Sequence, residues 1–263
     1  MSGFEADWLT LREPADRRAR DGALLKAAAE YAGRSSGPVV DIGCGTGSTF
    51  RALNPLLPDN QSWVFVDDDP LLLERARTAL PEEARTRVTM RRANLAEPAE
   101  GIFSGAALVT ASAFFDLVSA DYIAGFAQAL RRNAVDLYAA LTVDGRITWE
   151  RPHALDKAIV SAFKGDQGKD KGFGAGLGGD AAEVLENAFR SEGFEVRSAM
   201  SDWVLGSDDV GLQDAFHHGF AEPAREQLGA GEIEKWLSFR ASAARDGATV
   251  RVGHRDCLAL TSD

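Results

Sequence analysis

The chain has 263 residues, 45% of them hydrophobic, and a formal net charge of −11 at pH 7. This length is enough to bury a core, and the composition is that of a globular protein. The acidity disfavours DNA and RNA as partners, because proteins that modify nucleic acids neutralise phosphates with basic surfaces. Cys44 and Cys257 are too few for a disulfide framework or a thiolate cluster, so we expect no metal site.

No stretch approaches the roughly 18 consecutive apolar residues of a membrane span. The first twenty residues carry charges where an export signal would need an apolar run. We therefore expect a cytoplasmic protein that does not associate with membranes. The sequence leaves monomer and homodimer open.

Strand and helix signals alternate over the first 145 residues at the spacing of βαβ units. Apolar runs predict strands at 38–42, 62–66, 88–92, 106–112 and 136–142. Helices are predicted around 8–12, over 14–31, from 48, from 70 and over 123–132. Two of these helices begin with a proline, Pro14 and Pro70, and Asp69 can cap the second.

The pattern changes after residue 145. A strand-like extension at 146–149 precedes a long polar, glycine-rich stretch, and a helix is predicted over 180–191. Strands follow at 194–205 and 249–260, and helical segments interrupted by Pro223 and by glycines fill 210–245. Together these elements predict one α/β domain over 1–263. Its expected parts are a helical cover (1–33), a cofactor-binding core (34–145), a lid loop (146–180) and inserted helices (206–246).

The strongest motif is the turn that follows the first strand, where Gly43, Gly45 and Gly47 alternate with other residues. Glycines permit both a sharp strand-to-helix turn and the close approach of a ligand. The dinucleotide-binding fingerprint is spaced differently, and Ser48 stands where it would require a glycine or alanine. The motif resembles the first motif of class I S-adenosylmethionine (SAM)-dependent methyltransferases.

A second signal lies 20 residues past Gly47, where Asp67 ends the second strand. An acid there can accept hydrogen bonds from ribose hydroxyls, in SAM and NAD enzymes alike. Asn94 follows the third strand, and 108–118 is similar to the fourth strand and following loop of the methyltransferase family. Order and spacing favour one nucleoside site.

The resemblance covers about residues 37–145 and implies a Rossmann-like class I methyltransferase fold. That fold has a seven-stranded, mostly parallel sheet with helices on both faces and, here, an inserted lid. The resemblance also implies residues that contact SAM: Asp41, Gly43, Cys44, Gly45, Asp67, Asp68, Asn94, Leu95 and Ser112. Asn94 replaces the aspartate typical of the family, but an amide oxygen can accept the same hydrogen bond. Arg12 and Arg20 are candidates to bind the methionine carboxylate, although arginines of such a helix also pair with Glu13 and Asp16 at the surface.

Ligands of open α/β sheets bind beyond the carboxyl ends of the strands, where the lid and the inserted helices can reach. Six residues are candidate substrate contacts: Phe115, Trp149, Gln167, Lys171, Trp236 and Arg240. Gln167 and Lys171 lie in the glycine-rich stretch, which is alternatively a mobile surface loop. The tryptophans and Arg240 are alternatively parts of the core.

Asp116 and His217 are candidate bases for an acceptor that must lose a proton. A helix cap is the alternative role of Asp116, and a structural role is the alternative for His217. No Asn/Asp-Pro-Pro-aromatic sequence follows the fourth strand, which disfavours DNA bases and glutamine as acceptors.

The resemblance thus implies a SAM-dependent methyltransferase (EC 2.1.1.-) that methylates an N or O atom of a small, polar or anionic metabolite and releases S-adenosylhomocysteine (SAH). One alternative is a SAM-binding protein or enzyme of the same fold that transfers no methyl group. A NAD-dependent oxidoreductase is the next alternative.

Overall fold

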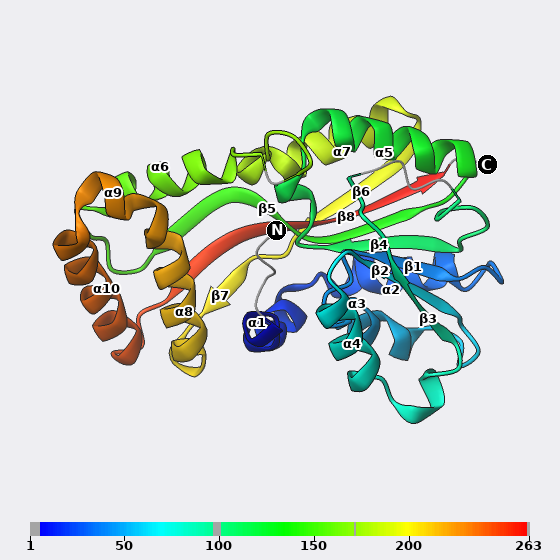
Figure 1. The fold of residues 1–263 in the computed structure, drawn as a ribbon, viewed down its shortest axis with the longest axis horizontal. Helices are drawn as coiled ribbons and strands as arrows, with labels where there is room; N and C mark the ends of the chain where they lie inside the picture. The colour runs from blue at the N-terminus through cyan, green and yellow to red at the C-terminus, as the bar shows by residue number, and fades with distance from the viewer. Residues whose placement is uncertain (1–5, 97–100, 171, 262–263) are drawn as a thin grey trace.

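The computed structural model describes residues 6–96, 101–170 and 172–261. In these residues the chain forms an eight-stranded sheet (Figure 1). Seven of the strands follow the order β3-β2-β1-β4-β5-β8-β6, and the eighth, β7, pairs with a different part of β8 from the part that pairs with β6. The strands are β1 (Val39–Ile42), β2 (Trp63–Asp67), β3 (Val88–Arg92), β4 (Leu108–Ser112), β5 (Leu137–Trp149), β6 (Phe194–Met200), β7 (Trp203–Leu205) and β8 (Val250–Thr261). The first five are parallel to one another, and β8 is antiparallel to β5, β6 and β7.

Helices cover both faces of the sheet, as the sequence predicts (Figure 1). One face packs against α2 (Gly22–Ala32), α3 (Ser48–Leu53) and α4 (Pro70–Ala79) through Val39, Phe65 and Leu108. The other packs against α5 (Ala120–Asn133) and α7 (Ala181–Ser191). Successive strand side chains point to opposite faces, so continuous apolar runs fill both layers.

The strands β5, β7 and β8 extend beyond this core to a second group of helices (Figure 1). These helices are α6 (Asp156–Gln167), α8 (Val210–Ala221), α9 (Arg225–Leu228) and α10 (Ala230–Arg245). Ile159, Phe220 and Trp236 form a separate apolar cluster there. The helices predicted over 210–245 are therefore present.

The N-terminal helices differ from the prediction. A single helix, α1 (Ala6–Ala19), runs through Pro14, and the chain breaks only at Arg20–Asp21 before α2. The predicted start at Pro14 is wrong because the stronger start signal lies at Asp21, whose carboxylate accepts the N–H of Leu24 at 2.8 Å.

The sheet has eight strands rather than the predicted seven, because the predicted strand 194–205 is two strands. The regular pairing with β8 is interrupted between Met200 and Trp203. Within this interruption, the Ser201 N–H donates to the His254 carbonyl at 2.9 Å. Conversely, the predicted strands 136–142 and 146–149 are one strand, β5, which pairs with β8 across two irregularities in register.

The segment 146–180 is not a loop throughout. It contains the end of β5 and the helix α6, so Gln167 is the last residue of a helix. The sequence obscures this helix because lysine, aspartate and glycine follow Phe163, whereas Ile159 and Ala162 are buried in the apolar cluster with Phe220 and Trp236. Among the described residues, no helix has the length and apolarity needed to cross a bilayer.

Candidate active site

The glycine turn forms the floor of a cavity at the carboxyl ends of β1, β2 and β4. Gly43, Gly45 and Gly47 all adopt positive φ angles, of 58°, 53° and 84°. A Cβ at Gly43 would lie 2.9 Å from the ring of Phe114, and one at Gly45 would lie 3.1 Å from Leu9. Glycine is therefore required here both by backbone conformation and by space.

Asp67 lies at the rim of this turn. Its carboxylate accepts the N–H groups of Gly45 at 2.9 Å and Asp69 at 3.0 Å, which fixes its orientation. Burial raises the pKa of Asp67. The same side chain therefore anchors the glycine turn and presents an acceptor to the cavity.

The cavity, which we call the cofactor cavity, has a volume of about 430 Å³, within the range of small-molecule sites. Most of the predicted cofactor residues line it: Gly43, Cys44, Gly45, Asp67, Asp68, Asn94, Leu95 and Ser112. They come from the ends of β1, β2, β3 and β4. The sequence thus predicted residues that the fold brings together.

Sequence reasoning missed several walls of this cavity, among them Leu9, Thr49 and Leu72. They lie on α1, α3 and α4, where their apolar or hydroxyl side chains resemble ordinary helix residues. Only the folded arrangement distinguishes them from other residues of their helices. Phe173, from the glycine-rich stretch, also lines the cavity and contacts Phe114 ring to ring at 5.7 Å.

Arg20 and Asp41 do not line the cavity but lie buried beneath it. Arg20 donates to the Ser112 hydroxyl at 3.0 Å, and Asp41 accepts from the Thr110 hydroxyl at 2.7 Å. Burial raises the pKa of Asp41 to about 7. One Arg20 nitrogen, Nη1, is buried without a hydrogen-bond partner in the described part of the chain. Both residues therefore support the cavity from behind, whereas Arg12 reaches its surface.

A second cavity of about 320 Å³, which we call the inner pocket, adjoins the first. Arg12 and Ala113 line both. Aromatic and aliphatic side chains form most of the inner pocket: Trp8, Val143, Ile147, Val160, Phe163, Trp203, Phe216, Phe220 and Val252. Asp116, Gln167 and His254 are among its few polar residues. An apolar pocket with few polar groups is typical of a site for a small organic molecule.

Arg12 is held where the two cavities meet. Asp16 accepts its Nε and Nη2 at 2.9 and 3.1 Å and also accepts the Trp203 indole N–H at 2.9 Å. The guanidinium lies 4.8 Å from the centre of the Trp203 ring. The sequence offered pairing with Asp16 as the alternative to a role of Arg12 in binding the methionine carboxylate. The structure shows this pairing, and Arg12 nevertheless lines both cavities.

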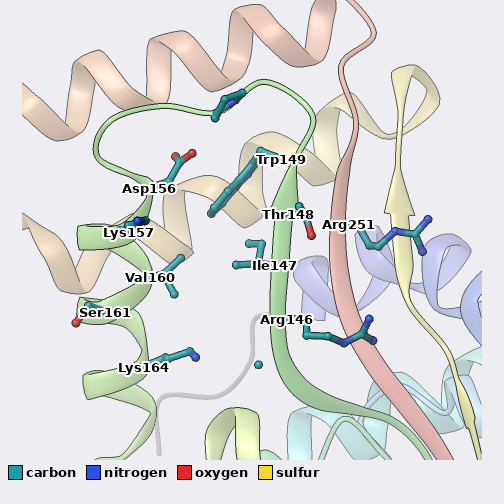
Figure 2. Close-up of a pocket in the computed structure, with 12 residues that line it drawn as sticks. Arg146, Ile147, Thr148, Trp149, Asp156, Lys157, Val160, Ser161, Lys164 and Arg251 are labelled. Atoms are coloured by element: carbon teal, nitrogen blue, oxygen red, sulfur yellow. The ribbon is translucent and has the colours of Figure 1, made fainter.

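A wide, open groove continues from the inner pocket between β5 and α6 (Figure 2). We call it the outer groove; its volume is about 720 Å³. It shares five residues with the inner pocket: Gly145, Arg146, Ile147, Val160 and Lys164. Trp149, a predicted substrate contact, lines the groove rather than the inner pocket.

The other predicted substrate contacts have mixed outcomes. Gln167 lines the inner pocket, and Lys171 lies outside the described residues. Phe115 is 1% exposed, packs in the core and lines none of the three cavities. Trp236 and Arg240 are also buried, and both donate to Asp156, so their alternative role as core residues is the one that the structure shows.

The two candidate bases are separated by the fold. Asp116 lines the inner pocket three residues after Ala113. His217 lines none of the three cavities and is 2% exposed, packed against Trp149 and Trp236. Its Nε2 accepts the Trp149 indole N–H at 3.0 Å, and burial lowers its pKa to about 3. The structure therefore places His217 in the core rather than at the site.

Comparison with known proteins gives the class of this domain. Residues 39–135 match the family model described as "Methyltransferase domain". The fold is similar to the YcgJ protein of Bacillus subtilis, with 13% identity, a TM-score of 0.52, and coverage of 92% of this chain and 98% of that chain. It is also similar to a cyclopropane-fatty-acyl-phospholipid synthase-like protein of Lactobacillus casei, with 17% identity, a TM-score of 0.52, and coverage of 93% and 91%. None of the curated proteins matches.

The chain therefore contains a class I SAM-dependent methyltransferase domain. The protein is a SAM-dependent methyltransferase, with SAM as methyl donor and SAH as product. The residues present fit this cofactor, since Gly43 and Gly45 expose backbone without side chains to the cavity and Asp67 offers an acceptor for ribose hydroxyls.

Proposed function

We propose that the protein methylates an N or O atom of a small molecule held in the inner pocket. The observation that carries this proposal is the junction of the two cavities at Arg12 and Ala113. Ala113 directly follows β4 and adopts a φ of 50°, which turns the chain between the cavities. An acceptor in the inner pocket would thus lie next to the cofactor cavity.

Bound SAM supplies an electrophilic methyl group, and the chain's own residues supply position and an apolar environment. Trp8, Trp203 and Phe216 form apolar walls of the inner pocket. Holding the reacting atoms in line can account for much of the rate, because it removes the entropy cost of their encounter. Asp116 lines the same pocket and is the residue that we propose takes the proton of an N–H or O–H acceptor.

The lining of the inner pocket also bears on the acceptor. Its wall is mostly aromatic and aliphatic, so the part of the acceptor that enters it should be apolar. A polar or anionic metabolite, as proposed from the sequence, would then have to keep its charged part outside.

We place the protein in the cytoplasm, because both of its cysteines are free and buried.

Gly219→Leu tests this function. Gly219 lines the inner pocket from α8, and a Cβ there would meet no atom within 4 Å, so a side chain can be added at this wall of the pocket. Gly211→Leu is the matched control, because Gly211 lies on the same helix, also has free space and lines none of the three cavities. Both changes should favour the helix by about 1 kcal/mol.

The assay is SAH formation from SAM across a panel of apolar amines, phenols and carboxylates, together with SAH binding by calorimetry. We expect Gly219→Leu to abolish turnover of the accepted compound, with SAH affinity unchanged, and Gly211→Leu to behave as wild type. A protein that binds SAH but forms none with any compound would support the alternative of a SAM-binding protein without methyl transfer. Equal turnover by both variants would remove the inner pocket as the acceptor site.

A further inference from the structure

The outer groove collects positive charge on a chain whose net charge is −11. Four cationic side chains line it: Arg146, Lys157, Lys164 and Arg251. The two arginines are neutralised by carboxylates, since Arg146 pairs with Asp144 and Asp202 and Arg251 pairs with Asp202 at 3.1 Å. The arginines therefore contribute little free charge to the groove.

The two lysines differ from the arginines. In the described residues, the lysines with ion pairs are Lys169 and Lys235, so Lys157 and Lys164 have no carboxylate partner there. The groove's own acid, Asp156, accepts from the buried Arg240, from Trp236 and from a backbone N–H. The lysines thus leave a net positive charge that the groove itself does not compensate.

These lysines lie on one face of α6. Lys157, Val160, Ser161 and Lys164 follow the i, i+3, i+4, i+7 spacing of a helix face, and all of them line the groove. Figure 2 shows Val160 and Lys164 extending from α6 toward β5, where Ile147 lies opposite. On this face Val160 and Ser161 lie between the two lysines.

Lys164 also lines the inner pocket, together with Val160 and Ile147. A molecule whose apolar body fills the inner pocket would therefore emerge beside the Lys164 ammonium. Phe163 and Phe220 line the inner pocket and are in contact at 4.2 Å between ring centres, whereas Lys164 is exposed and lines both cavities. The apolar side chains thus lie on the inner-pocket side of the junction and the ammonium lies on the groove side.

We propose that the outer groove is the anion-binding part of the acceptor site. The acceptor is then an amphipathic anion, whose apolar body occupies the inner pocket and whose carboxylate or phosphate binds Lys164. Lys157 lies seven residues before Lys164 on α6, which is about 10 Å at 1.5 Å per residue. It would bind a second charge on a longer acceptor. This inference rests on the proposed function of the inner pocket.

The test uses four probes on the SAH-saturated protein: 1-naphthyl phosphate, 1-naphthoate, 1-naphthol and inorganic phosphate. We expect at least one naphthyl anion to bind more tightly than both naphthol and phosphate, and its affinity to fall as salt is raised. Whichever of 1-naphthyl phosphate and 1-naphthoate binds with the higher affinity identifies the class of anion that the groove prefers. Equal affinity for naphthol and both naphthyl anions would overturn the proposal.

Lys164→Gln should weaken binding of the preferred naphthyl anion about five- to tenfold and leave naphthol binding unchanged. Lys26→Gln is the matched control, because Lys26 is exposed on α2 and changes the net charge equally. Equal losses in the two variants would show a general charge effect and would overturn the anion site. A protein that fails to bind SAH before any probe is added would instead overturn the proposed function itself.

Discussion

Replacing His217 by glutamine should make the protein less sensitive to acid. His217 is neutral in the fold, because burial lowers its pKa to about 3, with the charge of Arg240 contributing in the same direction. In the unfolded chain its pKa is about 6.5. The unfolded state therefore binds an extra proton between these values, so the stabilisation is complete above pH 6.5 and is lost as pH falls.

The magnitude follows from these two pKa values. At pH 5 the unfolded histidine is almost fully protonated and the folded one is not, which costs about 1.4 kcal/mol for each of about 1.5 pH units, or about 2 kcal/mol. Asp41 acts in the opposite sense, since its raised pKa of about 7 makes the fold less stable as pH rises toward that value. The difference between wild type and variant isolates His217 from Asp41.

The assay is urea unfolding at about pH 5 and pH 7.5 for wild type and His217→Gln. The amide can still accept the Trp149 indole N–H, so we expect the variant to fold. The wild-type loss of free energy of unfolding on acidification should exceed that of the variant by about 2 kcal/mol. Identical losses would show that His217 is not held neutral by burial. A loss of SAH formation at pH 7.5 in a folded variant would return His217 to the active site.

Two further substitutions test the cofactor cavity and its cover. Asp67→Asn should weaken SAH binding about ten- to hundredfold by calorimetry, because a hydrogen bond to a charged group is worth about 1.5–3 kcal/mol; an unchanged affinity would contradict its role toward ribose. Asp16→Ala should lower the free energy of unfolding by about 3–5 kcal/mol, since it leaves Arg12 buried without its partner. Glu74→Ala, which breaks an exposed pair with Arg77, should lower the free energy of unfolding by less than about 1 kcal/mol. Similar losses in the two variants would show that the buried pair of Asp16 is worth no more than the exposed one.

The cofactor cavity could be predicted from sequence because its determinants are local. The strands β1, β2 and β4 are short, mostly apolar runs, and all four strands from β1 to β4 end in a polar or glycine-rich turn at the same edge of a parallel sheet. Asp69 and Pro70 mark the start of α4 unambiguously, and the structure confirms the cap at 2.8 Å. A glycine or an aspartate at one of these turn positions thus specifies both the backbone turn and a contact with the cofactor cavity.

The inner pocket could not be predicted in this way, because its walls are far apart in the sequence. Trp8, Phe216 and His254 come from α1, α8 and β8. Each of these side chains is compatible with an ordinary core position when it is read alone. His217 illustrates the opposite error, since a histidine suited to proton transfer is buried beside two tryptophans.

The helix α1 connects the two cavities more closely than the sequence suggests. Leu9 lies over the glycine turn, Trp8 lines the inner pocket and Arg12 lines both cavities. Ion pairs hold the helix at its two sides, from Glu13 to Arg51 at 2.6 Å and from Arg18 to Asp209 at 2.5 Å. Because one helix supplies walls to both cavities, a displacement of α1 would change the cofactor cavity and the inner pocket together.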